Sequence, residues 1–121
     1  MEFFISKEFN FDAAHQLTEY HGKCENLHGH TYKLRVTLKG HIDSKGMIID
    51  FTILKNIVKE KVIEKLDHRF LNEIVPKSTA ENIALWIWSE LKPILTSPNY
   101  NLYEIILWET ETSFVCLRED K

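Results

Sequence analysis

The segment CENLHGHTY, residues 24–32, gathers a thiol, a carboxylate and two imidazoles within seven positions. His28 and His30 are two residues apart, and on an extended chain such residues point to the same side, so both imidazoles can reach one ion. His15 lies near the end of the preceding predicted strand, which antiparallel pairing would bring alongside. Three neutral imidazoles without a fourth protein ligand are typical of a catalytic zinc ion, which keeps a position for water or substrate. The pattern predicts a zinc site; the ordinary alternative is a set of solvent-facing or hydrogen-bonded histidines.

Two roles are open to Cys24, which lies four residues before His28. As a fourth zinc ligand, its thiolate would close a His₃Cys site of the structural type. As a free thiolate beside the open position of the metal, kept deprotonated by the nearby positive charge, it would act as a base. The spacing allows both roles, and only the second leaves a catalytic zinc site.

Asp67 and His68 form a second candidate group, at the predicted end of a helix. A carboxylate that orients an imidazole is an arrangement suited to proton transfer. Adjacent residues do not face each other on a helix, so a direct pair requires that the helix has ended. The ordinary alternative is that the histidine interacts favourably with the dipole at the helix C-terminus.

Glu109 follows the apolar segment 105–108, where a carboxylate needs a hydrogen-bond donor. Such a carboxylate commonly recognises the amidine-like or guanidine-like edge of a ligand, or else forms an ion pair. Ser78 and Glu81 fit a capping box at the start of a helix, and Thr79 suits its first turn. Local helix chemistry alone therefore explains Thr79 and Glu81.

These groups must be positioned by strands and helices, which the hydrophobic periodicity predicts. The order β-β-α-α-β-β indicates an α+β domain with an antiparallel sheet. Two helices can cover one sheet face only, so the other face and the edges need further cover, for which a neighbouring subunit is the natural candidate. The predicted elements are a strand from residue 3 towards 15, a strand over 31–38 ending at Gly40, a helix from the N-cap Asp50 to Leu66, a helix from Ser78 to the TSPN segment at 96–99, and strands within 102–109 and 113–119.

Composition narrows the classes of function. The 121 residues correspond to one domain, and 44% hydrophobic with 27% charged residues is an ordinary globular balance. A net charge of -3, with Lys and Arg spread along the chain, argues against nucleic acid as a partner. No run approaches the length of a membrane span, and the N-terminal residues lack the apolar core of a signal peptide. We therefore expect a cytoplasmic protein whose two cysteines, Cys24 and Cys116, stay reduced.

The order of several motifs resembles that of one enzyme family. The motifs are FDAAH, CENLHGH, GMIIDF, LDHRFLN, TAEN and WET, and they span essentially the whole chain. They are similar to those of the 6-pyruvoyl-tetrahydropterin synthase / 6-carboxy-tetrahydropterin synthase family. The resemblance implies a tunnelling fold (T-fold), in which subunits of two β-hairpins and two helices form barrel-like trimers. These trimers would pair into homohexamers with active sites at subunit interfaces.

The resemblance also implies roles for the groups described above. The residues that would hold zinc and transfer protons are His15, His28 and His30 as zinc ligands, Cys24 as the proton-abstracting base, and Asp67 with His68 as the rest of the relay. Glu109 resembles the anchor for the aminopyrimidine edge of the pterin, with Thr79 and Glu81 nearby. Ala80 departs from relatives that carry a second threonine there, so the hydrogen bond of that threonine would come from elsewhere.

The implied substrate is 7,8-dihydroneopterin triphosphate, whose side-chain hydroxyls would bind a zinc ion acting as a Lewis acid. The small size and the short segment between Cys24 and His28 resemble the bacterial 6-carboxy type, which releases acetaldehyde and triphosphate and feeds 7-deazaguanine and queuosine synthesis. Glu25 resembles a subgroup in which a glutamate here promotes cleavage to 6-hydroxymethyl-7,8-dihydropterin for folate synthesis; otherwise it is a solvated acid. The alternatives are a pyruvoyl- or hydroxymethyl-forming enzyme, or a non-catalytic module that binds zinc and pterin.

Overall fold

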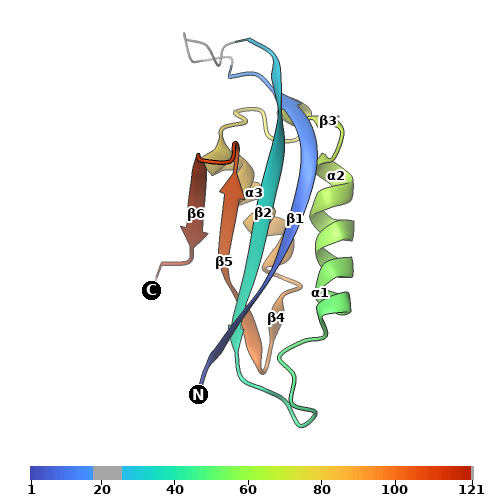
Figure 1. The fold of residues 1–121 in the computed structure, drawn as a ribbon, viewed down its shortest axis with the longest axis vertical. Coiled ribbons are helices and arrows are strands. Elements are labelled where there is room, and N and C mark those ends of the chain that lie inside the picture. Colours follow the sequence, from blue (N-terminus) through green and yellow to red (C-terminus); the bar gives the residue numbers. More distant parts are fainter. Residues whose placement is uncertain (18–25, 121) are drawn as a thin grey trace.

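The computed structural model describes residues 1–17 and 26–120, which form a twisted sheet with helices packed on one side (Figure 1). The main strands are β1 (Phe3–His15), β2 (His28–Gly40), β5 (Tyr100–Trp108) and β6 (Phe114–Arg118), each antiparallel to its neighbour. Two short strands flank them: β3 (Arg69–Phe70) runs parallel to β1, and β4 (Thr96–Ser97) pairs with β5. The predicted α+β architecture with an antiparallel sheet is confirmed, and β3 and β4 are additions to it.

β1 and β2 form one long hairpin, paired from Phe3 with Gly40 to His15 with His28. Successive side chains of a strand point to opposite faces, so the hairpin separates two kinds of residue. We call the face that packs against the helices the inner face and the opposite one the outer face. The buried strand residues on the inner face are Phe11, Ala13, His15, Tyr32, Leu34, Val36, Leu38, Leu102, Ile105 and Leu107.

The first helical segment comprises α1 (Phe51–Val58), a π-helical turn (Lys59–Ile63) and α2 (Glu64–Leu66). Asp50 is its N-cap, as predicted, and its carboxylate accepts the backbone N–H of Thr52 at 2.7 Å. The π-helical turn interrupts the regular α-helical hydrogen bonding without ending the helix. Four of its residues, Leu54, Val58, Val62 and Leu66, are buried in the same core as the inner face of the sheet.

The start of α3 (Ala80–Leu91) differs from the predicted capping box. Thr79, rather than Ser78, is the N-cap, and its hydroxyl accepts the backbone N–H of Asn82 at 3.2 Å. Ser78 is buried, and its hydroxyl donates to Asn72 at 2.9 Å. The capping box of Ser78 with Glu81 is therefore wrong, because the serine hydroxyl serves a partner outside the helix.

The end of α3 also differs from the prediction, which extended the helix to the TSPN segment. The helix ends at Leu91, and the chain forms β4 a few residues later. Pro93 accounts for the early end, because proline has no N–H to donate to the preceding turn.

None of the helices in the described residues combines the length and the hydrophobicity that a membrane span requires.

The outer face of the sheet carries ion pairs instead of a second hydrophobic layer. Glu8 lies 2.8 Å from Nε of Arg35 and 3.2 Å from Nζ of Lys33. Glu104 accepts from Nε of Arg118 at 2.7 Å and is only 8% exposed. No described element covers this face, and within the described chain β6 pairs with β5 alone.

Candidate functional site

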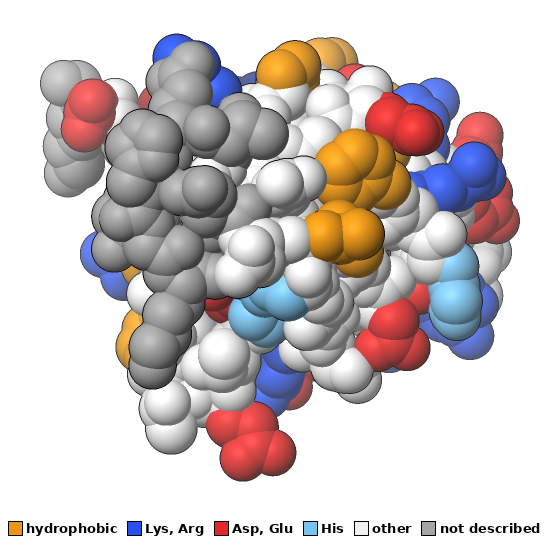
Figure 2. Space-filling view, turned by 90° about the horizontal axis from the view of Figure 1, so that it is seen from above, with side chains coloured by type: hydrophobic (Ala, Val, Ile, Leu, Met, Phe, Trp, Pro, Cys, Tyr) orange, Lys and Arg blue, Asp and Glu red, His pale blue; other side chains and the backbone are white. Residues whose placement is uncertain are grey.

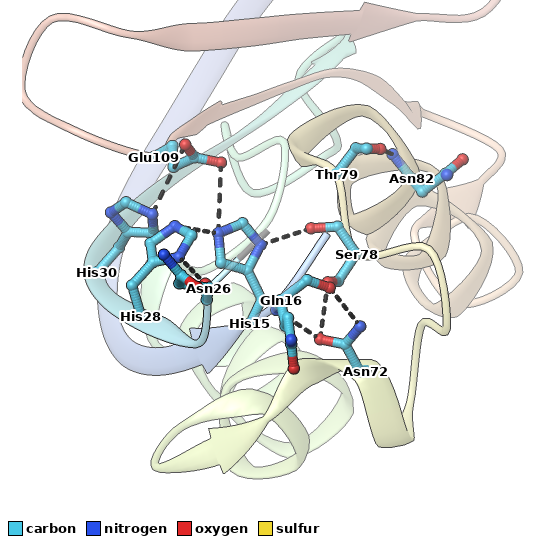
Figure 3. Close-up of polar contacts among 10 residues, drawn as sticks. All are labelled: His15, Gln16, Asn26, His28, His30, Asn72, Ser78, Thr79, Asn82 and Glu109. Carbon is cyan, nitrogen blue, oxygen red and sulfur yellow. Dashed lines mark hydrogen bonds and ion pairs between the residues drawn. The ribbon is translucent and has the colours of Figure 1, made fainter. Parts of the chain in front are cut away.

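The three histidines singled out in the sequence converge at one end of the β1–β2 hairpin (Figure 3). His15 ends β1 opposite His28, which begins β2, and the pairing of Ala13 with His30 places the third imidazole on the same face. One ring nitrogen from each histidine lies within 4.8 Å of the other two. Among the described residues, no Cys, Asp or Glu offers an atom within that distance of all three nitrogens.

Hydrogen bonds determine which nitrogen carries the proton in two of these rings. Nδ1 of His15 lies 2.7 Å from the carbonyl O of Ser78, and Nδ1 of His28 lies 2.7 Å from the carbonyl O of Asn26. Because a carbonyl oxygen only accepts, both Nδ1 atoms donate, and both Nε2 atoms carry lone pairs in the neutral rings. These Nε2 atoms face each other at 3.0 Å. A cation or a shared proton between them satisfies this arrangement, whereas two lone pairs alone repel.

The third imidazole, that of His30, presents a further ring nitrogen to the same point. Nε2 of His30 is buried and has no hydrogen-bond partner among the described residues. Burial lowers the pKa of His30, although the nearby Glu109 opposes this effect. The neutral ring favoured in this way is the form that binds metal ions. Nitrogens bound to one tetrahedral zinc ion at about 2.0–2.1 Å lie about 3.3 Å apart, so this donor set fits zinc.

Tyr32 lies beneath the histidines and was not singled out in the sequence. Its ring stacks on Phe11 at 5.0 Å and meets the rings of His15 and His30 edge-on at 6.2 Å and 5.5 Å. Its buried hydroxyl has no hydrogen-bond partner among the described residues, and burial raises the pKa of Tyr32. The signal in the sequence is the two-residue step from His30, which puts both side chains on the inner face.

Glu109 also points to the histidines. It continues the alternation of Ile105 and Leu107, which are buried on the inner face. Its Oε1 lies 3.6 Å from Nε2 of His30, and its Oε2 lies 4.0 Å from Nε2 of His15 (Figure 3). The carboxylate is 26% exposed, so it borders the histidine nitrogens on one side and solvent on the other.

A hollow of about 260 Å³ adjoins Glu109. Thr79 and Glu81, at the start of α3, line it together with Leu17, which follows β1. The structure thus brings the three residues implied for pterin binding to one place beside the histidines.

Asp67 and His68 lie where α2 has ended, as a direct pair requires. Asp67 is extended (ψ 130°), and His68 has a positive φ of 59°, which is uncommon for a residue other than glycine. Oδ2 of Asp67 lies 3.1 Å from Nδ1 of His68. The backbone of Asp12 holds both residues, accepting the N–H of His68 at 2.6 Å and donating to Oδ1 of Asp67 at 2.9 Å. The hydrogen bond from Asp12 is the main cause that lowers the pKa of Asp67.

This pair does not join the three histidines within one chain. The side chain of Asp12, which lies within 4.8 Å of both Asp67 and His68, alternates with Ala13 and so belongs to the outer face. Asp12 and His68 line a hollow of about 620 Å³ that extends along the strands to His30. His68 is 78% exposed. Figure 2, the view onto this end of the molecule, shows histidine side chains in separate places on the surface.

Cys24 and Glu25 lie outside the described residues, so their predicted roles stay predictions. Cys116, on β6, is a free thiol whose Sγ donates to Glu104 at 3.2 Å. Burial and the nearby carboxylate raise the pKa of Cys116, which makes this thiol a poor nucleophile at neutral pH.

Comparison with known proteins decides the family. The model of the family described as 6-pyruvoyl tetrahydropterin synthase matches residues 4–120. This chain belongs to that family. The match includes all three groups of site residues described above, and it confirms the family that the motifs had indicated.

Proteins with different names resemble this chain. It is 42% identical to the 6-carboxy-5,6,7,8-tetrahydropterin synthase of Haemophilus influenzae, over 93% of this chain and 96% of that protein. It is 43% identical to the dihydroneopterin monophosphate aldolase of Pyrococcus furiosus, over 83% of each. The structure of Caenorhabditis elegans 6-pyruvoyl tetrahydropterin synthase matches with a TM-score of 0.88 at 30% identity, over 99% and 97% of the two chains. The predicted T-fold is thereby confirmed.

Two residues behind His15 were not predicted as part of the site. The sequence pattern predicts a helix-capping role for Ser78, yet its carbonyl accepts from His15. Asn72 ends the LDHRFLN motif, which was interpreted only through Asp67 and His68, and it contacts Ser78. The position of Asn72 in that motif is the one signal that the sequence offered.

Proposed function

We propose that this protein is a zinc-dependent 6-carboxy-5,6,7,8-tetrahydropterin synthase. It would convert 7,8-dihydroneopterin triphosphate and water into 6-carboxytetrahydropterin, acetaldehyde and triphosphate, in the cytoplasm and for queuosine or other 7-deazaguanine synthesis. The observation that carries the proposal is the convergence of three imidazole nitrogens beside Glu109. The named 6-carboxy relative, at 42% identity over most of both chains, supports the choice of product.

In this proposal the inner-face histidines hold the zinc ion through Nε2. Nδ1 of His15 and Nδ1 of His28 are engaged with carbonyl oxygens, so the lone pairs needed for the metal lie on the opposite nitrogens. When bound, zinc would act as a Lewis acid that makes the carbon-bound protons next to the side-chain hydroxyls of the substrate more acidic. The rest of the chemistry falls to side chains of this protein.

Glu109 would anchor the pterin, because a carboxylate accepts two parallel hydrogen bonds from an aminopyrimidine edge. The adjoining hollow supplies further polar groups. The hydroxyl of Thr79 accepts from the backbone N–H of Asn82 and keeps its own hydrogen to donate to a ligand. The carboxylate of Glu81 also lines the hollow. Anchoring at Glu109 would place the side chain of the pterin near the histidines.

Proton transfer would involve Cys24 as the base and Asp67 with His68 as the relay. Asp67 and His68 form a group with Asp12 at the outer face of the sheet, and not with the three histidines of their own chain. They would therefore complete the site of another subunit in a homohexamer made of two trimers. Two observations on the described chain support such an assembly. The outer face has no cover, and β6 pairs with β5 alone.

The proposal is tested by turnover of 7,8-dihydroneopterin triphosphate in the zinc-loaded protein and in Cys24→Ala. We expect the wild type to release triphosphate and acetaldehyde, and Cys24→Ala to keep its fold and zinc but lose turnover. Near-normal turnover in Cys24→Ala would show that another group is the base. A wild type that binds zinc and pterin without releasing triphosphate would be a non-catalytic binding module.

A second candidate function is cleavage to 6-hydroxymethyl-7,8-dihydropterin, promoted by Glu25. The relative named dihydroneopterin monophosphate aldolase, at 43% identity, favours carbon–carbon cleavage in this family. Mass spectrometry of the products of wild type and Glu25→Ala separates the two functions. Absence of hydroxymethylpterin, or its unchanged formation in Glu25→Ala, would remove the role of Glu25.

A further inference from the structure

The imidazole of His15 is held from behind by a residue 63 positions away in the sequence. Nδ1 of His15 donates to the carbonyl O of Ser78 at 2.7 Å, and both residues are buried. This contact directs Nε2 of His15 towards His28 (Figure 3). The orientation of the ring therefore depends on where the backbone of Ser78 lies.

Ser78 lies in an irregular segment before α3, and the side chain of Asn72 ties this segment to the end of β1. Oδ1 of Asn72 accepts from the hydroxyl of Ser78 and from the backbone N–H of Gln16, both at 2.9 Å. Nδ2 of Asn72 donates to the carbonyl O of Gln16 at 2.7 Å and to that of Pro76 at 3.0 Å. One amide thus holds the residue after His15 and the residues around Ser78 at the same time.

The contacts of Asn72 require a side-chain amide. An amide presents two donors and an acceptor in one plane, which matches the N–H and C=O of Gln16. An aspartate at this position would lack both donors, and an apolar residue would lack all four contacts. Asn72 is itself fixed by a 3₁₀ turn (Leu71–Glu73), in which Leu71 is fully buried. The backbone that carries Asn72 is therefore anchored in the core.

We propose that Asn72 is a positioning residue for the metal site, which acts on His15 through Ser78. The inference rests on the proposed function, because its consequence is a zinc ion held by Nε2 of His15. Loss of the hydrogen-bond partners behind metal-bound histidines typically weakens metal binding about 10- to 100-fold. Ser78 also directly precedes Thr79, the N-cap of α3. The hydrogen bonds of Asn72 therefore also position the start of α3, the helix that lines the hollow beside Glu109.

Asn99 provides a matched control, because it lies at the other end of the sheet from the site. Its Nδ2 also donates to two carbonyl oxygens, those of His41 at 3.0 Å and Ile48 at 3.1 Å. Its Oδ1 also accepts from a serine hydroxyl, that of Ser97 at 3.1 Å. Loss of either amide removes comparable hydrogen bonds, but only Asn72 is connected to His15.

The test measures zinc dissociation constants of the full chain by competition with a chelator. The variants are Asn72→Ala, Ser78→Ala and Asn99→Ala, each with the thermal unfolding midpoint of its metal-free form. We expect zinc to bind about 10- to 100-fold more weakly to Asn72→Ala. We expect a smaller loss in Ser78→Ala, which keeps the carbonyl but not the hydroxyl. Asn99→Ala should match the wild type in zinc affinity while its unfolding midpoint falls.

The outcomes separate the two proposals. A wild type that does not bind zinc contradicts the proposed function itself. A wild type that binds zinc, with Asn72→Ala and Ser78→Ala unchanged in affinity, contradicts only the positioning role. An equal loss of zinc affinity in Asn99→Ala would also contradict it, because general loosening would then explain the effect. If Asn72→Ala does not fold, Ser78→Ala decides, and unchanged zinc affinity in that variant overturns the inference.

Discussion

The three convergent histidines and the Asp67–His68 pair lie at the same end of the sheet, on opposite faces, and they are held in different ways. His15 is 1% exposed, and its Nδ1 has a buried carbonyl partner. His68 is 78% exposed and is held by its backbone N–H and by Asp67. Fixed, desolvated nitrogens suit a permanently bound ion, whereas an exposed acid–base pair is suited to a site that another chain completes. Under the proposed function, one chain would therefore supply two half-sites, which meet between subunits, and not one whole site.

The largest expected effect is on the inner face. His15→Ala removes one of three imidazole donors, so stoichiometric zinc binding should be lost and turnover should fall by on the order of 10³ or more. Metal analysis after gel filtration and release of triphosphate measure the two effects. Full zinc content with normal turnover would show that His15 is a buried core histidine.

On the outer face, His68→Ala should lower turnover by about 10²- to 10⁴-fold, the usual contribution of a general acid or base. Zinc affinity should stay that of the wild type, because His68 does not belong to the group formed by His15, His28 and His30. The contrast with His15→Ala is the sharpest distinction between the two faces.

Mixed assemblies test whether the half-sites meet between subunits. Co-expression of His15→Ala with His68→Ala chains should recover part of the turnover, because some interfaces would pair an intact half-site from each chain. Inactive mixed assemblies would mean that both groups serve the site of their own chain.

Glu109→Gln keeps the shape of the side chain and removes its charge. A hydrogen bond to a charged group contributes about 1.5–3 kcal/mol, so KM should rise about 10- to 100-fold with zinc affinity retained. Steady-state kinetics and metal analysis measure both quantities. A loss of zinc would identify Glu109 as a metal ligand, which its 3.6 Å distance from Nε2 of His30 brings into reach.

The smallest expected effect is a pH dependence of stability from Asp67. The backbone hydrogen bond from Asp12, followed by the contact with His68, lowers the pKa of Asp67 below 3.8 in the folded chain. The stabilisation by the ionised carboxylate is complete above pH 3.8 and is lost as the pH falls through the folded pKa. Urea unfolding of Asp67→Asn should therefore lack this part of the acid dependence. An unchanged profile would show that the contact with Asp12 is not maintained in solution.

Much of the inner face could be predicted from local pattern. Strand alternation places His28 and His30 on one side, and antiparallel pairing adds His15. The same alternation places Glu109. The separation of Asp67 from these residues depends on where α2 meets β1, which periodicity does not encode. Ser78 lies 63 positions from His15 and Asn72 lies 56 positions from Gln16, and the capping pattern indicated a different role for Ser78.

The central claim is that three imidazoles hold a zinc ion and leave one coordination position open to substrate. X-ray absorption at the zinc edge of the loaded, substrate-free protein tests it most directly. We predict nitrogen and oxygen scatterers at about 2.0–2.1 Å and no sulfur at about 2.3 Å. A zinc–sulfur distance there would mean that Cys24 closes the site, and a protein that retains no zinc would contradict the account altogether.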